Sequence, residues 1–242
     1  MASTITVNQT NLATTLGGTI DSTKVYLIDG TIDFTGTGLQ ITVPVGGISI
    51  IGTTFDVSKL ICSDINYTLF VSAVGGSGNL LGMDYAMEVT GAGSQVYNLT
   101  DATGLNAFDF HRINYNDCTS LGTITDYRQG LESGTGRFGG TPELTLAGTW
   151  SGGFFIDTSI VRGLTDGAYS LFKAGAGFSM ASRFRSNQNL DLNATVALLD
   201  FAPANFPNPN TLQLEGCIIV VVNDLQYVPY FKYASVMPPD VF

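Results

Sequence analysis

The chain has 242 residues, of which 44 % are hydrophobic and 12 % are charged, and its formal net charge is −10. This charge excludes nucleic-acid binding through a basic surface, because Lys and Arg side chains hold phosphates. The sequence contains no apolar run as long as a membrane-spanning helix, so we expect no membrane insertion. Its start, MASTITVNQT, lacks the basic residues and apolar core of a secretory signal, so we expect none.

Short β-prone segments, separated by Gly, Asn, Asp and Thr turns, follow one another from residue 25 to about residue 222. The sequence predicts strands within 25–34, 41–51, 67–74, 85–90, 95–100, 108–115, 122–127, 143–150, 154–162, 169–173, 178–184 and 196–201. After a Pro-rich stretch at 202–210, further strands are expected at 212–222 and 227–233. Because no segment shows a sustained apolar stripe of helical period, we expect almost no helix.

Two all-β architectures use strands of this kind, and the turns favour one of them. Two-residue hairpin signals are scarce, since Asp29-Gly30 and Asp166-Gly167 are the only Asp-Gly or Asn-Gly pairs. Sandwiches depend on such hairpins, whereas solenoid coils join short strands through irregular loops. The sequence therefore predicts a right-handed parallel β-helix, with a β-sandwich or jelly roll as the alternative. We expect residues 21–200 to form it, 1–20 to dock the protein to a larger particle, and 201–242 to cap it.

Low surface charge predicts self-association. The charged fraction is about half the usual quarter, and the chain has 29 glycines and a mean hydropathy of +0.23. A solenoid with apolar flanks and open ends requires partners or caps. We therefore expect the chain to associate with copies of itself.

The segments VYLIDGTIDFTGTG (25–38) and GLQITVPVGGISIIG (38–52) resemble the first coils of the parallel β-helices in tailed-phage spikes and fibres. In this chain and in those β-helices, a strand, a Gly-bearing turn and a second apolar strand make up each rung. The resemblance covers roughly residues 20–200. It implies a homotrimeric virion protein such as a tail spike, tail fibre, head fibre or capsid-associated appendage, made in the host cytoplasm. Its partners would be other virion proteins and host-surface polysaccharide. A secreted bacterial β-solenoid adhesin is a further alternative.

Four carboxylates in the central coils define the alternative enzymatic function, a carbohydrate depolymerase acting as a glycoside hydrolase or lyase. Glycoside hydrolysis requires two carboxylates roughly 5–9 Å apart and no cofactor. Asp109, Asp117, Asp126 and Glu132 fall in successive coils, where they would converge on one groove. An enzyme is therefore expected to have clustered acidic residues and exposed aromatic residues. A structural fibre is expected to have scattered acidic residues and buried aromatic residues.

His111 is the only histidine and alternates with Asp109 on one face of the strand expected at 108–115, which predicts a structural pair because no nucleophile is marked. Two aromatic residues, Tyr127 and Trp150, are the candidates for stacking on a sugar ring. We expect a non-enzymatic structural or adhesive protein, with most aromatics in the core.

The sequence predicts no metal site and no cofactor. Cys62, Cys118 and Cys217 are widely spaced, without a CxxC pair, and we expect buried free thiols. The stretch at 134–139, GTGRFG, matches a dinucleotide-binding pattern but lacks the strand before it and the helix after it. We therefore interpret it as a loop.

Overall fold

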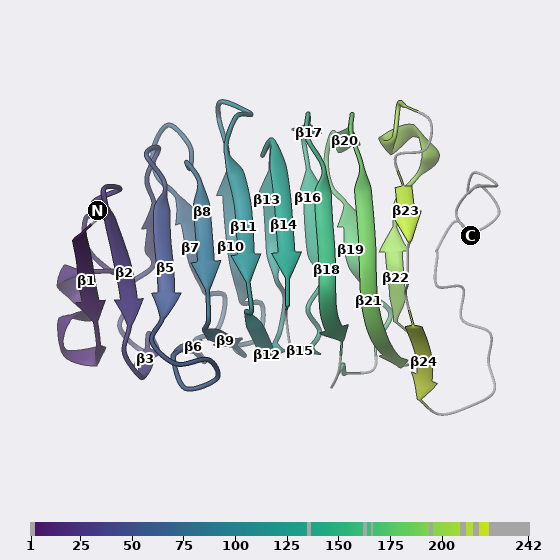
Figure 1. The fold of residues 1–242 in the computed structure, drawn as a ribbon. Helices are drawn as coiled ribbons and strands as arrows, with labels where there is room; N and C mark the ends of the chain where they lie inside the picture. Colours follow the sequence, from purple (N-terminus) through teal and green to yellow (C-terminus); the bar gives the residue numbers. More distant parts are fainter. Residues whose placement is uncertain are drawn as a thin grey trace.

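Parallel strands stacked into three long sheets form the body of the protein (Figure 1). The computed structural model describes residues 3–134, 137–161, 164–165, 167–193, 196–208, 212–214 and 218–222. Sheet A contains ten strands: β1 (Ser3–Val7), β2 (Lys24–Ile28), β5 (Ile48–Gly52), β8 (Leu80–Met83), β11 (Ala107–His111), β14 (Gln129–Ser133), β18 (Phe154–Val161), β21 (Phe184–Asn193), β23 (Leu212–Leu214) and β24 (Ile218–Val222).

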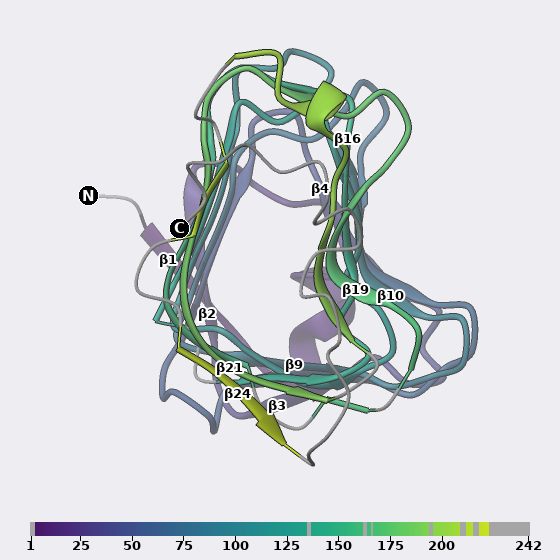
Figure 2. The ribbon, with the colours of Figure 1, turned by 90° about the vertical axis from the view of Figure 1, so that its right-hand side faces the viewer.

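Two further sheets form the other sides of the cross-section (Figure 2). Sheet B contains β3 (Thr31–Asp33), β6 (Lys59–Cys62), β9 (Ala86–Val89), β12 (Asn114–Cys118) and β15 (Arg137–Gly140). Sheet C contains β4 (Ile41–Val43), β7 (Thr68–Ser72), β10 (Gln95–Thr100), β13 (Gly122–Thr125), β16 (Leu144–Ala147), β19 (Ser170–Ala174) and β22 (Ala197–Asp200). A small fourth sheet pairs β17 (Thr149–Trp150) with β20 (Ser179–Met180).

From β2 to β16 the chain passes through sheets A, B and C in turn and then returns to sheet A one strand further along. Paired residues in neighbouring coils are between 21 positions apart, as for Ser3 and Lys24, and 32 positions apart, as for Ile48 and Leu80. Every pairing between named strands is parallel, unlike the antiparallel pairing of a sandwich or jelly roll. The all-β, solenoid-type prediction is thus confirmed.

Aromatic side chains fill much of the space between the sheets. Contacts between rings run along the stack through Phe70, Tyr97, Phe108, Tyr127, Trp150, Phe154, Phe184, Phe201 and Phe206. Their centroids lie 5.0–6.3 Å apart, within the range of favourable ring packing. Each strand of a coil sends alternate side chains inward, so successive coils add rings to one continuous core.

Aspartates with a left-handed backbone lie at corners where the chain turns between sheets and, for Asp117, at the register shift within β12. Six described non-glycine residues have positive φ, and four of them are Asp: Asp56, Asp84, Asp117 and Asp126, with Asn66 and Arg112. Asp and Asn tolerate this left-handed conformation because their short polar side chains hydrogen-bond locally. The corners also divide several segments that the sequence predicted as single strands. Segment 25–34 becomes β2 and β3, segment 41–51 becomes β4 and β5, and segment 108–115 breaks at Arg112.

The N-terminal segment belongs to the stack. Strand β1 pairs along its whole length with β2, and the 3-10 helix η1 (Gln9–Thr14) follows it. Gln9 exchanges two hydrogen bonds with the backbone of Asp33 in β3, and Leu12 is buried in the core. The coils therefore begin before the boundary expected at residue 20.

At the other end the coils continue past residue 200. A second 3-10 helix, η2 (Pro203–Asn205), precedes β23, and both β23 and β24 pair with β21. The strand expected at 227–233 and the rest of 223–242 lie outside the described residues. Within the described ranges, no helix has the length and apolar character needed to cross a membrane.

Candidate functional site on the outer face of sheet A

The outer face of sheet A carries two rows of side chains that run along the stack. Row 1 consists of Val25, Ser49, Leu81, Asp109, Leu131, Phe155 and Arg185, which are register partners in successive strands. Row 2, two residues further along each strand, consists of Leu27, Ile51, Met83, His111, Ser133 and Asp157. Strand alternation produces this face, because the residues between the rows, such as Phe110, point into the core.

At the middle of this face the two rows bring together a carboxylate, an imidazole and a hydroxyl. Asp109 and His111 lie on β11, and Ser133 is the partner of His111 on β14. The Nδ1 atom of His111 is 2.5 Å from the Oγ atom of Ser133. When the Ser133 hydroxyl donates to Nδ1, a neutral His111 carries its proton on Nε2. Ser133 therefore orients the ring through Nδ1, and the tautomer of His111 decides which of the two atoms donates.

The Asp109 carboxyl group has an unusual environment for an outer face. Its Oδ1 atom is buried and has no hydrogen-bond partner among the described residues. Burial raises the pKa of Asp109 above its usual value, and the nearby charges of His111 and Arg128 oppose that rise only in part. A buried charged oxygen without a donor is unfavourable, so burial favours the protonated form of Asp109, in line with its raised pKa.

This trio differs from a hydrolytic triad in one respect that matters for chemistry. In a triad the carboxylate accepts from the ring nitrogen opposite the nucleophile and stabilises the imidazolium that forms. Here no hydrogen bond between Asp109 and His111 is present among the described contacts, so the ring lacks that support. The shared face of Asp109 and His111 was predicted from strand alternation. Ser133 was missed because it lies 22 residues from His111 in an irregular coil, and only the register aligns the two.

The four carboxylates expected to converge on a groove point in different directions. Asp109 is on the outer face of sheet A, whereas Glu132, on the neighbouring strand β14, points into the core and is only 2 % exposed. Tyr115 donates a hydrogen bond to Glu132 Oε1, and the Tyr115 hydroxyl lies 3.1 Å from that of Tyr97. Burial raises the pKa of Tyr115 well above its usual value. The core position of Glu132 removes it from any surface groove.

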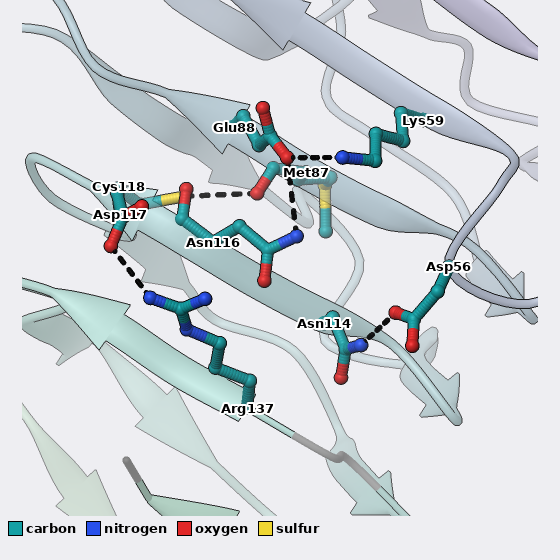
Figure 3. A network of polar contacts seen from close by, with 9 residues as sticks. All are labelled: Asp56, Lys59, Met87, Glu88, Asn114, Asn116, Asp117, Cys118 and Arg137. Atoms are coloured by element: carbon teal, nitrogen blue, oxygen red, sulfur yellow. Dashed lines mark hydrogen bonds and ion pairs between the residues drawn. The ribbon is translucent and has the colours of Figure 1, made fainter. Parts of the chain in front are cut away.

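Asp117 lies on the outer side of sheet B, where charges are paired within the chain (Figure 3). Its Oδ1 atom is 2.9 Å from Nη2 of Arg137. One coil away, Lys59 Nζ is 2.7 Å from Glu88 Oε1, which also accepts a hydrogen bond from Asn116 at 3.2 Å. Asp117 thus takes part in a surface ion pair, on a different sheet from Asp109.

Asp126 lies at the corner between sheets C and A, at the edge of a pocket of about 310 Å³. The pocket is lined by Asp101, Ala102, Thr103, Gly104, Asp126, Thr149 and Ser151. Asp126 Oδ1 accepts a hydrogen bond from the Thr149 backbone at 2.6 Å. Asp101 accepts four from Thr103 and Asn106. Both carboxylates therefore hold turns of the backbone.

The two aromatic residues expected to stack on sugar are both completely buried, so this prediction is wrong for the described chain. Tyr127 donates its hydroxyl hydrogen to Ser77 Oγ at 2.7 Å, and its ring centroid is 6.3 Å from that of Trp150. Trp150 Nε1 donates to the backbone of Ala147 at 2.9 Å. Because both side chains belong to the core, neither ring presents a face to a ligand.

Two of the cysteines are buried free thiols, as expected, while Cys217 lies outside the described residues. Cys118 Sγ donates to the Met87 carbonyl at 3.4 Å, a contact drawn in Figure 3. In the described part of the chain, no three His, Cys, Asp or Glu side chains are grouped so as to hold a metal ion. Of the glycine-rich stretch 134–139, residues 135 and 136 also lie outside the described residues, and 137–139 begin strand β15.

Comparison of the chain with protein-family models, with curated proteins and with solved structures found no match.

Proposed function

We propose that the chain is a structural or adhesive virion protein, a fibre, spike or capsid-associated appendage built as a homotrimer of right-handed parallel β-helices. The observation that carries this proposal is the position of the acidic and aromatic residues in the fold. The four candidate carboxylates occupy the outer face of sheet A, the outer side of sheet B, a corner and the core. The large aromatic side chains fill the core. An enzyme acting on polysaccharide requires the opposite distribution.

The architecture supports a mechanical or adhesive role. A solenoid is a rigid rod whose coils contact only their neighbours, so it suits a spacer or a display surface. The low charge of the sequence and the apolar residues along sheet A support assembly with other copies. Adhesion would use host-surface glycan as the ligand, and other virion proteins would hold one end of the rod.

The experiment compares cleavage with binding. Purified full-length protein is incubated with bacterial surface polysaccharides, and we measure released reducing ends, unsaturated products and retention of protein on the immobilised polymer. We expect no released products, with or without retention. Release of products that is abolished by Asp109→Asn or Asp126→Asn would overturn the proposal in favour of a depolymerase. Heat-denatured protein controls for hydrolysis that occurs without the folded chain.

A further inference from the structure

The corners between sheets C and A differ in length from one coil to the next. The corner between β10 and β11 spans residues 101–106, and the corner between β16 and β18 spans residues 148–153. The corner that lies between them, from β13 to β14, spans only residues 126–128. Figure 1 shows it lower than the loops that lead into β11 and β18. The short corner therefore leaves a notch between two longer ones.

This notch is the pocket of about 310 Å³ at Asp126. Its lining comes from all three corners, with residues 101–104 on one side, Asp126 on the floor, and Thr149 and Ser151 on the other side. Because neighbouring coils are about 4.8 Å apart, the two long corners are separated by about 10 Å. The volume is at the small end of the range for small-molecule sites, about 300–1,000 Å³. The notch is therefore suited to one small ligand, such as a single sugar ring.

The walls of the notch are held in place before any ligand binds. Asp101 is 1 % exposed and accepts four hydrogen bonds, at 2.7–2.9 Å, from Thr103 and Asn106. Asp126 Oδ1 accepts from the Thr149 backbone at 2.6 Å, which ties the floor of the notch to the corner beyond it. A site whose walls are already ordered loses less conformational entropy on binding.

Three side-chain oxygens in the notch are available to a ligand: Asp126 Oδ2, Thr149 Oγ1 and Ser151 Oγ. None of them has a hydrogen-bond partner among the described residues, and Thr149 and Ser151 are exposed. A carboxylate oxygen accepts hydrogen bonds from hydroxyl groups, and the Thr and Ser hydroxyls both donate and accept, so this set matches the hydroxyl groups of a sugar. The carboxylates of Asp101 and Asp126 disfavour a negatively charged ligand. The described lining has no large apolar side chain, which disfavours an apolar ligand.

We propose that this notch binds one neutral sugar residue of a glycan through Asp126, Thr149 and Ser151. This inference rests on the adhesive form of the proposed function and names its ligand class and its site. Asp126 Oδ2 accepts from one sugar hydroxyl, while Thr149 and Ser151 hydrogen-bond to others from the facing wall. Tyr127 and Trp150, which follow Asp126 and Thr149 in the chain, are buried in the core. Recognition therefore uses hydrogen bonds from the polar neighbours of these aromatic residues and not ring stacking.

The test titrates four full-length proteins with glucose, galactose, mannose and rhamnose as neutral sugars and with glucuronic acid as an acidic one. Ligand-observed NMR gives the Kd of each sugar. The proteins are the unmodified chain, Asp126→Asn, Ser151→Val, and Asp29→Asn as the matched control. In Asp126→Asn the amide oxygen still accepts from the Thr149 backbone, so the change is confined to the Oδ2 position. Asp29 is exposed at the corner between β2 and β3, outside the notch. Thermal unfolding verifies that each variant is folded.

We expect at least one neutral sugar to bind the unmodified chain and Asp29→Asn with the same Kd, and glucuronic acid to bind more weakly. Asp126→Asn and Ser151→Val should each raise that Kd by roughly tenfold or more, because a hydrogen bond to the sugar is lost and, at position 151, the notch is partly filled. Equal affinity in all four proteins, or no binding of any neutral sugar by the unmodified chain, would overturn this inference. Glucuronic acid binding as tightly as the neutral sugars would also contradict it. The proposed function fails separately, through product release in the cleavage assay, which these titrations do not measure.

Discussion

Gly148→Ala tests how one coil supports the next at the corner between sheets C and A. Gly148 has a φ of +66°, and an added Cβ would lie 2.0 Å from Asp126 Oδ1 in the preceding coil. That oxygen accepts the backbone hydrogen bond from Thr149 at 2.6 Å. Alanine at position 148 must therefore move the Asp126 carboxylate and break this bond.

The matched control is Gly177→Ala, because Gly177 has a φ of +65° and open space around its added Cβ. Both variants carry the cost of an alanine in the left-handed region, about 1–2 kcal/mol. Only Gly148→Ala also leaves the Thr149 N–H without its acceptor, a further loss of about 1–3 kcal/mol. We expect Gly148→Ala to lose about 2–5 kcal/mol of the free energy of unfolding, and Gly177→Ala about 1–2 kcal/mol.

The assay is thermal unfolding followed by far-ultraviolet circular dichroism, in which 1 kcal/mol shifts Tm by about 2–4 °C for a chain of this length. In an Asp126→Ala background the hydrogen bond is already absent. Gly148→Ala should then cost no more than Gly177→Ala does, since only the left-handed strain remains. Equal losses for the two glycines in the unmodified background, or strict additivity with Asp126→Ala, would refute the stacking of Asp126 over Gly148.

Three further outcomes are expected. Trp150→Ala should lower the free energy of unfolding by about 3–5 kcal/mol in denaturant titration, because removal of the buried ring leaves a cavity. The same variant should leave retention on immobilised polysaccharide unchanged. Lost retention in a variant that is still folded would contradict the core position of Trp150. Asp101→Asn should destabilise the chain by about 1–3 kcal/mol at neutral pH. Burial by itself raises the pKa of Asp101, but the hydrogen bonds from Thr103 and Asn106 lower it overall. The contribution of Asp101 to the free energy of unfolding is therefore present above the unfolded pKa of about 4, and it is lost as pH falls through the lower folded pKa. The stability gap between Asp101→Asn and the unmodified chain should therefore narrow in acid, and a gap that widened there would reverse the sign of this linkage. Burial raises the pKa of the Cys118 thiol to about 12, so peptide mapping should find Cys118 unmodified by a disulfide reagent at neutral pH until the chain is denatured, and labelling of the folded protein would contradict its burial.

The sequence indicated the architecture because strand patterning and turn chemistry are local. Asp29-Gly30 correctly signals a change of direction, but the turn joins two sheets of a coil, so segment 25–34 divides into β2 and β3. The left-handed φ of Gly30 provides the corner. The alternation of Asp109 and His111 with buried Phe108 and Phe110 held for the same local reason, up to the corner at Arg112.

The site could not be assembled from the sequence because contacts between coils depend on coil length. Coils of 21 to 32 residues give no fixed sequence offset between stacked residues, so Ser133 could not be matched to His111. For the same reason, the sequence did not show that the Glu132 side chain points into the core. Tyr127 follows the corner residue Asp126 rather than lying within a strand, so alternation did not reveal its burial. In the N-terminal segment, the alternating β-prone residues of β1 were a usable signal for the first strand of sheet A.

The central claim, that this chain works as an assembled rod, is tested most directly by its mass in solution by light scattering. A mass near three times the 25.6 kDa of one chain, unchanged on dilution through the micromolar range, is the result that we predict. A mass of one chain at every concentration would contradict it, because the apolar rows on sheet A would then be stable in water without a partner.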